Sequence, residues 1–289
     1  DEPTAALTET EVDELFEIIR ELKKKDIGII YITHRIDEIK VITDRVSVMR
    51  DGKYIGTLIS KDSTKDDIIS MMVGRVIYEE PKTESKVPKD APVVLKVENL
   101  NAGRSVQNIS FELHKGEILG FAGLMGSGRT ETARAIFGAD PKESGDIYVN
   151  GTKVEIKSPQ DAVIHGIGYL SEDRKRYGIV VQRTVSENST MACLENFMNG
   201  FFINKKKENK ETEKYVRSLA IKTPNIDQLV VDLSGGNQQK VVLTKWLVKN
   251  CDILIFDEPT RGIDVGAKSD IYKLMNELVK EGKSIIMIS

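Results

Sequence analysis

Residues 253–260 read Ile-Leu-Ile-Phe-Asp-Glu-Pro-Thr. Four apolar residues in a row predict a strand buried on both faces, as in a parallel sheet. Such a strand delivers Asp257 and Glu258 to its carboxyl end, where open α/β sheets bind their ligands. An acidic pair after a strand is also a common helix start, so the pair alone leaves a purely structural interpretation open.

The last four of these residues recur at the start of the chain, as Asp1-Glu2-Pro3-Thr4. The two copies are 256 positions apart, and residues 1–33 and 257–289 are identical at ten positions without a gap. Each copy continues with apolar residues at helical spacing and then a short apolar run, residues 29–33 and 285–289, which we predict to be a buried strand. Solenoid repeats are only about 20 to 50 residues long, so this repeat predicts two copies of a whole domain and a longer parent of about 500 residues.

The composition is that of a soluble globular protein, with 40% hydrophobic and 30% charged residues. A net charge of -3 gives no broad electrostatic case for binding nucleic acid or an anionic membrane. No apolar run is long enough to span a bilayer, so a membrane role would require a partner. Cys193 and Cys251 lack metal-binding spacing and are interpreted as reduced, buried thiols.

Changes in composition divide the chain into three parts. Residues 1–78 form the end of the first copy, residues 79–92 a charged linker with three prolines, and residues 93–289 the second copy. In the first copy we predict helices at 35–40 and 66–73 and a hairpin, 46–49 and 54–56, around Asp51-Gly52. In the second copy we predict strands at 93–97, 110–113, 117–122, 145–149 and 166–170, a helix at 130–137, and a helical region at 181–219 whose segment 205–214 is a solvated face.

A glycine-rich loop follows the predicted strand at 117–122. Gly123, Gly126, Ser127, Gly128, Arg129 and Thr130 have phosphate-loop spacing, although a glycine-rich turn before a helix can be merely structural. The glycines let backbone N–H groups turn toward phosphates, and the helix start favours negative charge. Thr130 would ligate magnesium, Asp257 would hold the ion through water, and Glu258 would polarise the attacking water.

Arg129 departs from this pattern, which calls for lysine. A guanidinium is bulkier and planar, so the exchange is not conservative. We therefore expect the loop to bind nucleotide but to support only slow hydrolysis.

The stretch Leu233-Ser-Gly-Gly-Asn-Gln-Gln-Lys240 lies between the phosphate loop and the acidic pair. Ser234 reads as the N-cap of a helix, and the same hydroxyl and glycine N–H groups could bind an anion. With this stretch placed between the phosphate loop and the acidic pair, the sequence resembles the ATP-binding cassette of ABC transporters. The resemblance covers the whole chain. The resemblance implies an α/β P-loop NTPase fold of the ABC ATPase type, with a mixed sheet core and a helical subdomain. The chain would hold a partial first cassette and a nearly complete second one.

The sequence is more specifically similar to ATPases with two fused cassettes that drive bacterial import of ribose, galactosides or xylose. The motifs that support this lie at residues 126–131, 171–175, 234–240 and 72–75, the last reading Met-Val-Gly-Arg. The resemblance implies ATP and Mg²⁺ as cofactors, a permease in the membrane as the direct partner and a periplasmic or lipid-anchored sugar-binding protein as an indirect one. It also implies a peripheral location on the cytoplasmic side of the cell membrane.

In this family, cassettes pair head to tail, so each ATP lies between the phosphate loop of one and the Ser-Gly-Gly loop of the other. The resemblance makes Asp1 the magnesium-side acid of the first site, Glu2 its base and His34 its switch histidine. The Ser-Gly-Gly loop of the second cassette would complete this first site, through Ser234, Gly235, Gly236 and Asn237.

The second site would comprise the phosphate loop, Asp257 and Glu258. Glu172 stands where cassettes usually carry a glutamine that senses magnesium. With Arg129, this predicts an asymmetric ATPase whose first site is catalytic and whose second is degenerate. Because neither site is whole within 289 residues, we expect the chain by itself to be inactive and its first copy to be poorly ordered.

Three other functions remain open from the sequence. A soluble two-cassette ATPase acting on ribosomes or nucleic acid is the main alternative, although the short linker and slightly acidic charge oppose it. A regulatory protein that binds nucleotide without hydrolysis fits Arg129 but not Asp1, Glu2 and His34. A P-loop kinase would not need the Ser-Gly-Gly loop. The sequence does not name the sugar.

Overall fold

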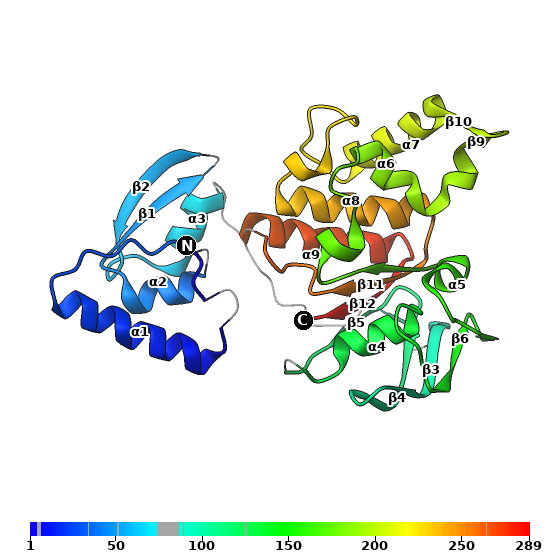
Figure 1. Cartoon of the computed structure of the whole chain (residues 1–289), viewed down its shortest axis with the longest axis horizontal. Coiled ribbons are helices and arrows are strands. Elements are labelled where there is room, and N and C mark those ends of the chain that lie inside the picture. Colours follow the sequence, from blue (N-terminus) through cyan, green and yellow to red (C-terminus); the bar gives the residue numbers. More distant parts are fainter. Residues whose placement is uncertain are drawn as a thin grey trace. The chain divides into compact units, whose positions relative to one another are not determined.

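The computed structural model describes residues 1–4, 7–33, 35–50, 52–73, 87–88, 90–124, 126–263 and 265–289. The chain divides into two compact units, residues 1–81 with 264–269 and residues 82–263 with 270–289 (Figure 1). Most of the predicted linker lies outside the described residues, as do His34 and the last two residues of the Met-Val-Gly-Arg motif.

The first unit contains three helices and a hairpin among its described residues. Helix α1 starts with a capping box between Thr8 and Glu11, which satisfies N–H groups at the helix start, and it buries Phe16 and Ile19. The predicted helices and hairpin are confirmed. Their bounds are α1 (Glu9–Lys24), α2 (Ile36–Ile42), β1 (Arg45–Arg50), β2 (Lys53–Ile59) and α3 (Lys65–Val73).

The predicted buried strand at residues 29–33 is wrong. All five residues are described, none is in a strand, and the side chains of Ile30 and Ile32 are 91% and 56% exposed. The equivalent strand of the second copy, β12 (Ser284–Ile288), pairs on one side with β11 (Ile253–Asp257) and on the other with β5 (Ile118–Phe121). No described strand of the first unit takes either place. Without neighbours to pair its backbone N–H and C=O groups, an apolar run cannot become a buried strand.

The second unit is built on two four-stranded sheets. One is parallel, with the strand order β5-β12-β11-β8, where β8 is Ile167–Leu170. The other is antiparallel, in the order β4-β3-β6-β7, with β3 (Val93–Ala102), β4 (Val106–His114), β6 (Ser144–Val149) and β7 (Thr152–Val154). Every residue of β11 and β8 is buried, which confirms the predicted buried parallel strand.

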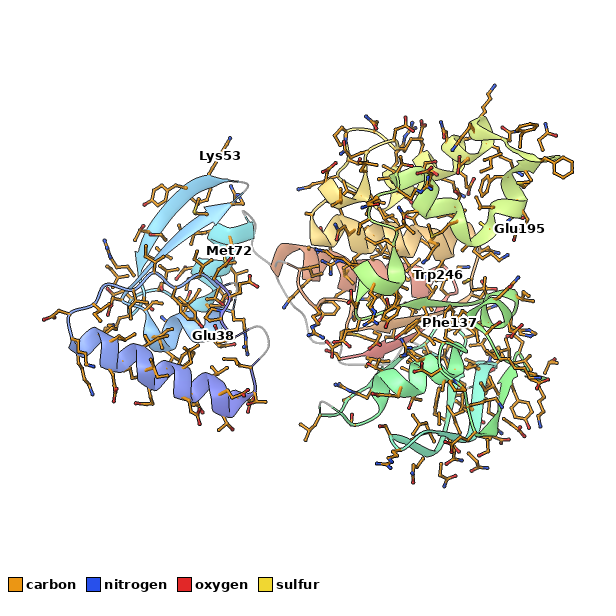
Figure 2. All side chains as sticks on the ribbon, viewed as in Figure 1. Glu38, Lys53, Met72, Phe137, Glu195 and Trp246 are labelled. Atoms are coloured by element: carbon orange, nitrogen blue, oxygen red, sulfur yellow. The ribbon has the colours of Figure 1, made fainter. Side chains whose placement is uncertain are left out.

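Helices cover these sheets. Helix α4 (Arg129–Ile136) contacts β11 of one sheet and β3 and β4 of the other, so it lies between them (Figure 1). Helix α8 (Gly235–Val248) packs on β8, and its Trp246 lies edge-on to Phe137 with ring centroids 5.9 Å apart (Figure 2). Outside the region 181–219, the other helical segments described after residue 93 are α5 (Pro159–Ile164), a π-helical turn η1 (Arg174–Gly178), η3 (Val230–Asp232) and α9 (Val265–Lys280).

The region 181–219 is helical, but it is not continuous. Helix α6 (Val185–Thr190) runs into the 3₁₀ segment η2 (Met191–Phe197), and a small hairpin of β9 (Met198–Asn199) and β10 (Phe202–Ile203) precedes α7 (Lys205–Ser218). Together with α8, these helices form the helical part of the second unit.

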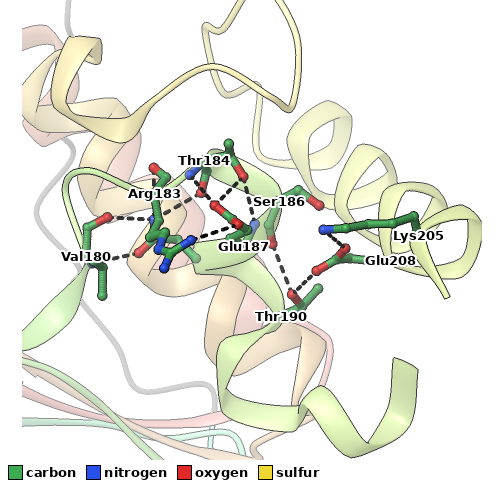
Figure 3. Close-up of polar contacts among 9 residues, drawn as sticks. Val180, Arg183, Thr184, Ser186, Glu187, Thr190, Lys205 and Glu208 are labelled. Atoms are coloured by element: carbon green, nitrogen blue, oxygen red, sulfur yellow. Dashed lines mark hydrogen bonds and ion pairs between the residues drawn. The ribbon is translucent and has the colours of Figure 1, made fainter. Parts of the chain in front are cut away.

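The prediction that residues 205–214 are a solvated face is only partly right. Glu208 is 1% exposed and Thr212 is fully buried. The hydroxyl of Thr190 donates to Oε1 of Glu208 at 2.7 Å, and Nζ of Lys205 lies 2.8 Å from Oε2 (Figure 3). The buried carboxylate therefore ties α7 to α6, because a charge can be buried only when it is paired.

The internal repeat is visible in the backbone. Helices α1 and α9 start and end at positions related by the same offset of 256 residues. Glu2 and Glu258 both adopt a positive φ, 43° and 44°, which is uncommon for any residue except glycine. The N–H of Glu2 donates to the carbonyl of Ile32 and that of Glu258 to the carbonyl of Ile288, again 256 residues apart. The two copies thus share their helix bounds and the backbone geometry at the acidic pair, although the described part of the first copy has no counterpart of β12.

Candidate functional site

The phosphate-loop residues lie between β5 and α4. Gly126 has a φ of 77°, and Gly128, the N-cap of α4, has a φ of 86°. A Cβ atom on Gly128 would lie 2.2 Å from the carbonyl oxygen of Ser105, so glycine is required by both conformation and space. The loop therefore places the start of α4, with its unpaired N–H groups, beside the ends of the parallel strands. Met125, within the loop, lies outside the described residues.

Thr130 and Asp257 come together although they are 127 residues apart in sequence. Thr130 lies in the first turn of α4, and its hydroxyl donates to Oδ1 of Asp257 at 3.1 Å. Asp257 is the last residue of β11, and it is fully buried. Hydroxyl and carboxylate oxygens are the ligands that Mg²⁺ prefers, and a magnesium site in nucleotide-binding proteins needs few protein ligands because phosphates supply the others.

Tyr169 is part of this cluster, although no role was predicted for it from the sequence. Its hydroxyl donates to Oδ2 of Asp257 at 2.7 Å, from a position on β8 opposite Ile255 of β11. Burial raises the pKa of Asp257, while the hydrogen bonds from Tyr169 and Thr130 oppose that rise. The available signal was a phenol in an otherwise apolar, fully buried strand, since a buried tyrosine hydroxyl needs a partner.

Glu258 and Arg129 face each other at 3.9 Å, between Oε1 and the guanidinium. Arg129 also donates to the carbonyl of Ser289. Burial raises the pKa of Glu258, and the charge of Arg129 offsets only part of that rise. Glu258 follows β11 with a positive φ of 44°, a conformation that is uncommon for residues other than glycine.

Glu172 lies two residues beyond β8 and pairs with Arg261. Arg174 lies in the same region. Its Nε donates to Oε1 of Gln238 at 3.2 Å, and its Nη1 donates to the carbonyl of Arg261, also at 3.2 Å. The guanidinium of Arg174 also lies against Gly235, where a Cβ atom would come within 2.7 Å. The start of α8 is thus linked to the loop after Asp257 through Arg174, which lies in the motif at residues 171–175, and no role was predicted for Arg261.

The predicted helix after Ser234 is confirmed, and Ser234 is its N-cap residue as predicted. Although Ser234 is the N-cap of α8, its side chain makes no capping hydrogen bond within the described helix. Instead its Oγ accepts from Nδ2 of Asn237 at 2.9 Å, and Oδ1 of Asn237 accepts from the N–H of Lys222. Asn237 therefore holds the hydroxyl of Ser234, which is an exposed residue, while Gly235 and Asn237 at the start of α8 are half-buried and Gly236 is buried.

Asp1 and Glu2, the acidic pair predicted for the first site, lie in the first unit, whereas Ser234, Gly235, Gly236 and Asn237, predicted to complete that site, lie in the second. Asp1 and Glu2 are exposed at the start of the first unit, and Glu2 has the backbone geometry of Glu258 described above. His34 lies outside the described residues. Across the described parts of the chain, no group of three or more His, Cys, Asp or Glu side chains is arranged to hold a metal ion.

The family model for ABC transporters matches residues 106–261, more than half of the chain, and this segment contains the phosphate loop, the Ser-Gly-Gly loop and the acidic pair. The chain belongs to the ABC transporter family. The predicted P-loop ATPase fold of the ABC type is therefore confirmed.

Relatives and solved structures agree with this assignment. The chain is 53% identical over its whole length to a putative ribose/galactose/methyl galactoside import ATP-binding protein of Burkholderia lata, and 54% identical to a ribose import ATP-binding protein of Clostridium tetani. It spans 56% and 57% of these relatives, so little more than half of their length.

Solved structures of similar fold are also ATP-binding cassettes. The structure of one such cassette of an ABC transporter in its ADP conformation aligns with 68% of this chain, over 81% of the cassette's own length, with a TM-score of 0.57 and 23% identity. A nucleotide-free cassette matches the same shares, with a TM-score of 0.60 and 22% identity. No described helix combines the length and apolar character needed to cross a membrane.

Proposed function

We propose that the chain is part of the energy-coupling subunit of an ABC importer for monosaccharides, which binds and hydrolyses ATP. The observation that carries the proposal is the meeting of Thr130, under the glycine loop, with Asp257 at the end of β11. The names of the relatives supply the substrate class, because they are described as importers of ribose, galactose and methyl galactoside.

In the second cassette, the N–H groups of the glycine loop and the start of α4 would hold the phosphates. The oxygens of Thr130 and Asp257 would hold Mg²⁺, which neutralises phosphate charge when it is bound. Glu258 would accept a hydrogen bond from the attacking water, and its raised pKa makes it a better proton acceptor than an exposed carboxylate.

The two ATP sites of the intact protein are proposed to be unequal. Arg129 is engaged with Glu258 and Ser289, and it cannot act as the compact point charge of a lysine. We assign slow hydrolysis to this second site, where Glu172 would occupy the position of the glutamine that usually senses magnesium. Asp1, Glu2 and His34, completed by Ser234, Gly235, Gly236 and Asn237 of a head-to-tail partner cassette, would form the catalytic first site. The 289-residue chain by itself is then expected to show negligible steady-state ATPase activity, and a robust signal from the purified chain would contradict this assignment.

The proposed partners are permease subunits in the membrane, with a sugar-binding protein acting indirectly, and the proposed location is the cytoplasmic face of the membrane. ATP would favour the closed pair of cassettes because it binds that state more tightly, and hydrolysis would release it. The net charge of -3 gives no support to the alternative of a ribosome- or nucleic-acid-directed ATPase.

Uptake of labelled ribose, xylose, galactose, methyl galactoside and arabinose tests this function. Uptake is compared in cells that carry the intact parent gene, cells that lack it, and deleted cells that regain it on a plasmid. We expect deletion to abolish uptake of one or a few of these sugars and the plasmid to restore it. Unchanged uptake of every sugar, with a defect in translation instead, would overturn the importer in favour of the soluble ATPase.

A further inference from the structure

We propose that Tyr169 is a positioning residue, which fixes the carboxylate of Asp257 so that Oδ1, the oxygen beside Thr130, is the one presented to magnesium. The inference rests on the proposed nucleotide site. It adds a residue outside the phosphate loop and the acidic pair, and it gives the two oxygens of Asp257 different tasks.

The two oxygens of Asp257 have different partners. Oδ1 accepts from the hydroxyl of Thr130 at 3.1 Å, on the side of the phosphate loop, and Oδ2 accepts from the hydroxyl of Tyr169 at 2.7 Å. Asp257 is fully buried and Tyr169 is only 7% exposed, so water does not compete for Oδ2. In a buried setting, a hydrogen bond to a carboxylate is both short and strong. Rotation of the carboxylate would break it, so Oδ1 stays on the side of the phosphate loop.

The phenol itself is held from several directions. Its ring packs against Phe137, with centroids 5.3 Å apart. The backbone carbonyl of Tyr169 accepts from Nε1 of Trp246 at 2.9 Å, which ties β8 to α8. Tyr169 and Asp257 also lie on strands that are paired in parallel, with Tyr169 opposite Ile255. A donor fixed by its strand and by two aromatic neighbours can hold the carboxylate in one orientation before the metal arrives.

This arrangement has a measurable consequence for metal affinity. Groups that orient a metal ligand without touching the metal typically change metal affinity about 10- to 100-fold when they are removed. Loss of the Tyr169 hydroxyl should therefore weaken metal binding. It should leave the phosphate loop unchanged, because Tyr169 contacts Asp257 through its hydroxyl and the interior through its ring.

The test is Tyr169→Phe in the 289-residue chain, with Mn²⁺ as the probe. Binding of Mn²⁺ in the presence of ATP is followed by electron paramagnetic resonance, and binding of ATP alone is measured in the presence of a chelator. Tyr215→Phe is the matched control, because it removes a tyrosine hydroxyl that donates to the carbonyl of Leu247 at 3.1 Å, away from the phosphate loop. We expect Tyr169→Phe to weaken Mn²⁺ binding about 10- to 100-fold with metal-free ATP affinity unchanged, and Tyr215→Phe to change neither.

Two results would overturn the proposal. One is unchanged Mn²⁺ affinity in Tyr169→Phe. The other is a loss of metal-free ATP affinity as large as the loss of Mn²⁺ affinity, together with a lower melting temperature. That result would make Tyr169 a purely structural residue. If the unmodified chain bound no Mn²⁺ with ATP, the proposed nucleotide site would fail as well, so that failure is distinguishable from a failure of Tyr169 alone.

Discussion

A single Cβ atom at position 128 would collide with the backbone that supports the phosphate loop. Gly128→Ala is expected to destabilise the second unit by a few kcal/mol, because the positive φ costs about 1–2 kcal/mol and the carbonyl of Ser105 must also move. Gly151→Ala is the control, since Gly151 has a φ of 76° but open space around its Cβ position. Urea unfolding followed by the fluorescence of Trp246, the single tryptophan, measures both variants. Equal losses in the two would show that the contact with Ser105 is unimportant.

Lys245 is a buried amine whose charge should make stability depend on pH. Burial lowers the pKa of Lys245 to about 8, and its Nζ donates to the carbonyl of Gly178 at 2.7 Å. The unfolded chain keeps an ordinary lysine with a pKa of about 10.4, so between about pH 8 and 10.4 it binds more protons than the folded state. The free energy of unfolding contributed by this group therefore rises with pH across that window, by about 3 kcal/mol in total, and is constant below it.

Comparison with Lys245→Met isolates this effect, because all other groups titrate alike in both proteins. We expect the unmodified protein to gain stability relative to Lys245→Met as the pH rises from 8 to 10, in urea unfolding at a series of pH values. Parallel stability curves for the two proteins would contradict a buried lysine with a lowered pKa.

At the scale of elements, local pattern predicted most of the structure, and its failures have physical causes. The phosphate-loop helix, the buried strand β11 and the helices of both copies are found as predicted, since periodicity and apolar runs encode them. Residues 29–33 fail because strand formation depends on neighbours that a local pattern does not contain. Glu208 and Tyr169 were missed because their burial and partners depend on tertiary packing.

The junction of α6 and α7 offers a test of the buried Glu208. Lys205→Met would leave the buried carboxylate of Glu208 without its paired cation, so we expect a loss of about 1–3 kcal/mol in the free energy of unfolding. Lys206→Met is the matched control, because it removes the same charge from the adjacent exposed position and should cost less than about 0.5 kcal/mol. Equal small effects, measured by urea unfolding, would mean that the pair with Lys205 contributes nothing.

At the scale of the whole molecule, the repeat accounts for the proposal that one chain carries parts of two ATP sites. The shared bounds of α1 and α9 and the shared geometry of Glu2 and Glu258 show that both copies present their acidic pair on the same local frame. Arg129 and Glu172 are departures in the second copy, and they carry the proposed inequality of the two sites.

The most direct measurement is ATP hydrolysis by the intact two-cassette protein, assembled with its permease, in the variants Glu2→Gln and Glu258→Gln. These substitutions remove the same proton acceptor from two sites that share one backbone geometry, so each is the control for the other. We predict that Glu2→Gln abolishes turnover, because it inactivates the catalytic site, and that Glu258→Gln only reduces it. Equal loss of activity in both variants would contradict the asymmetric account.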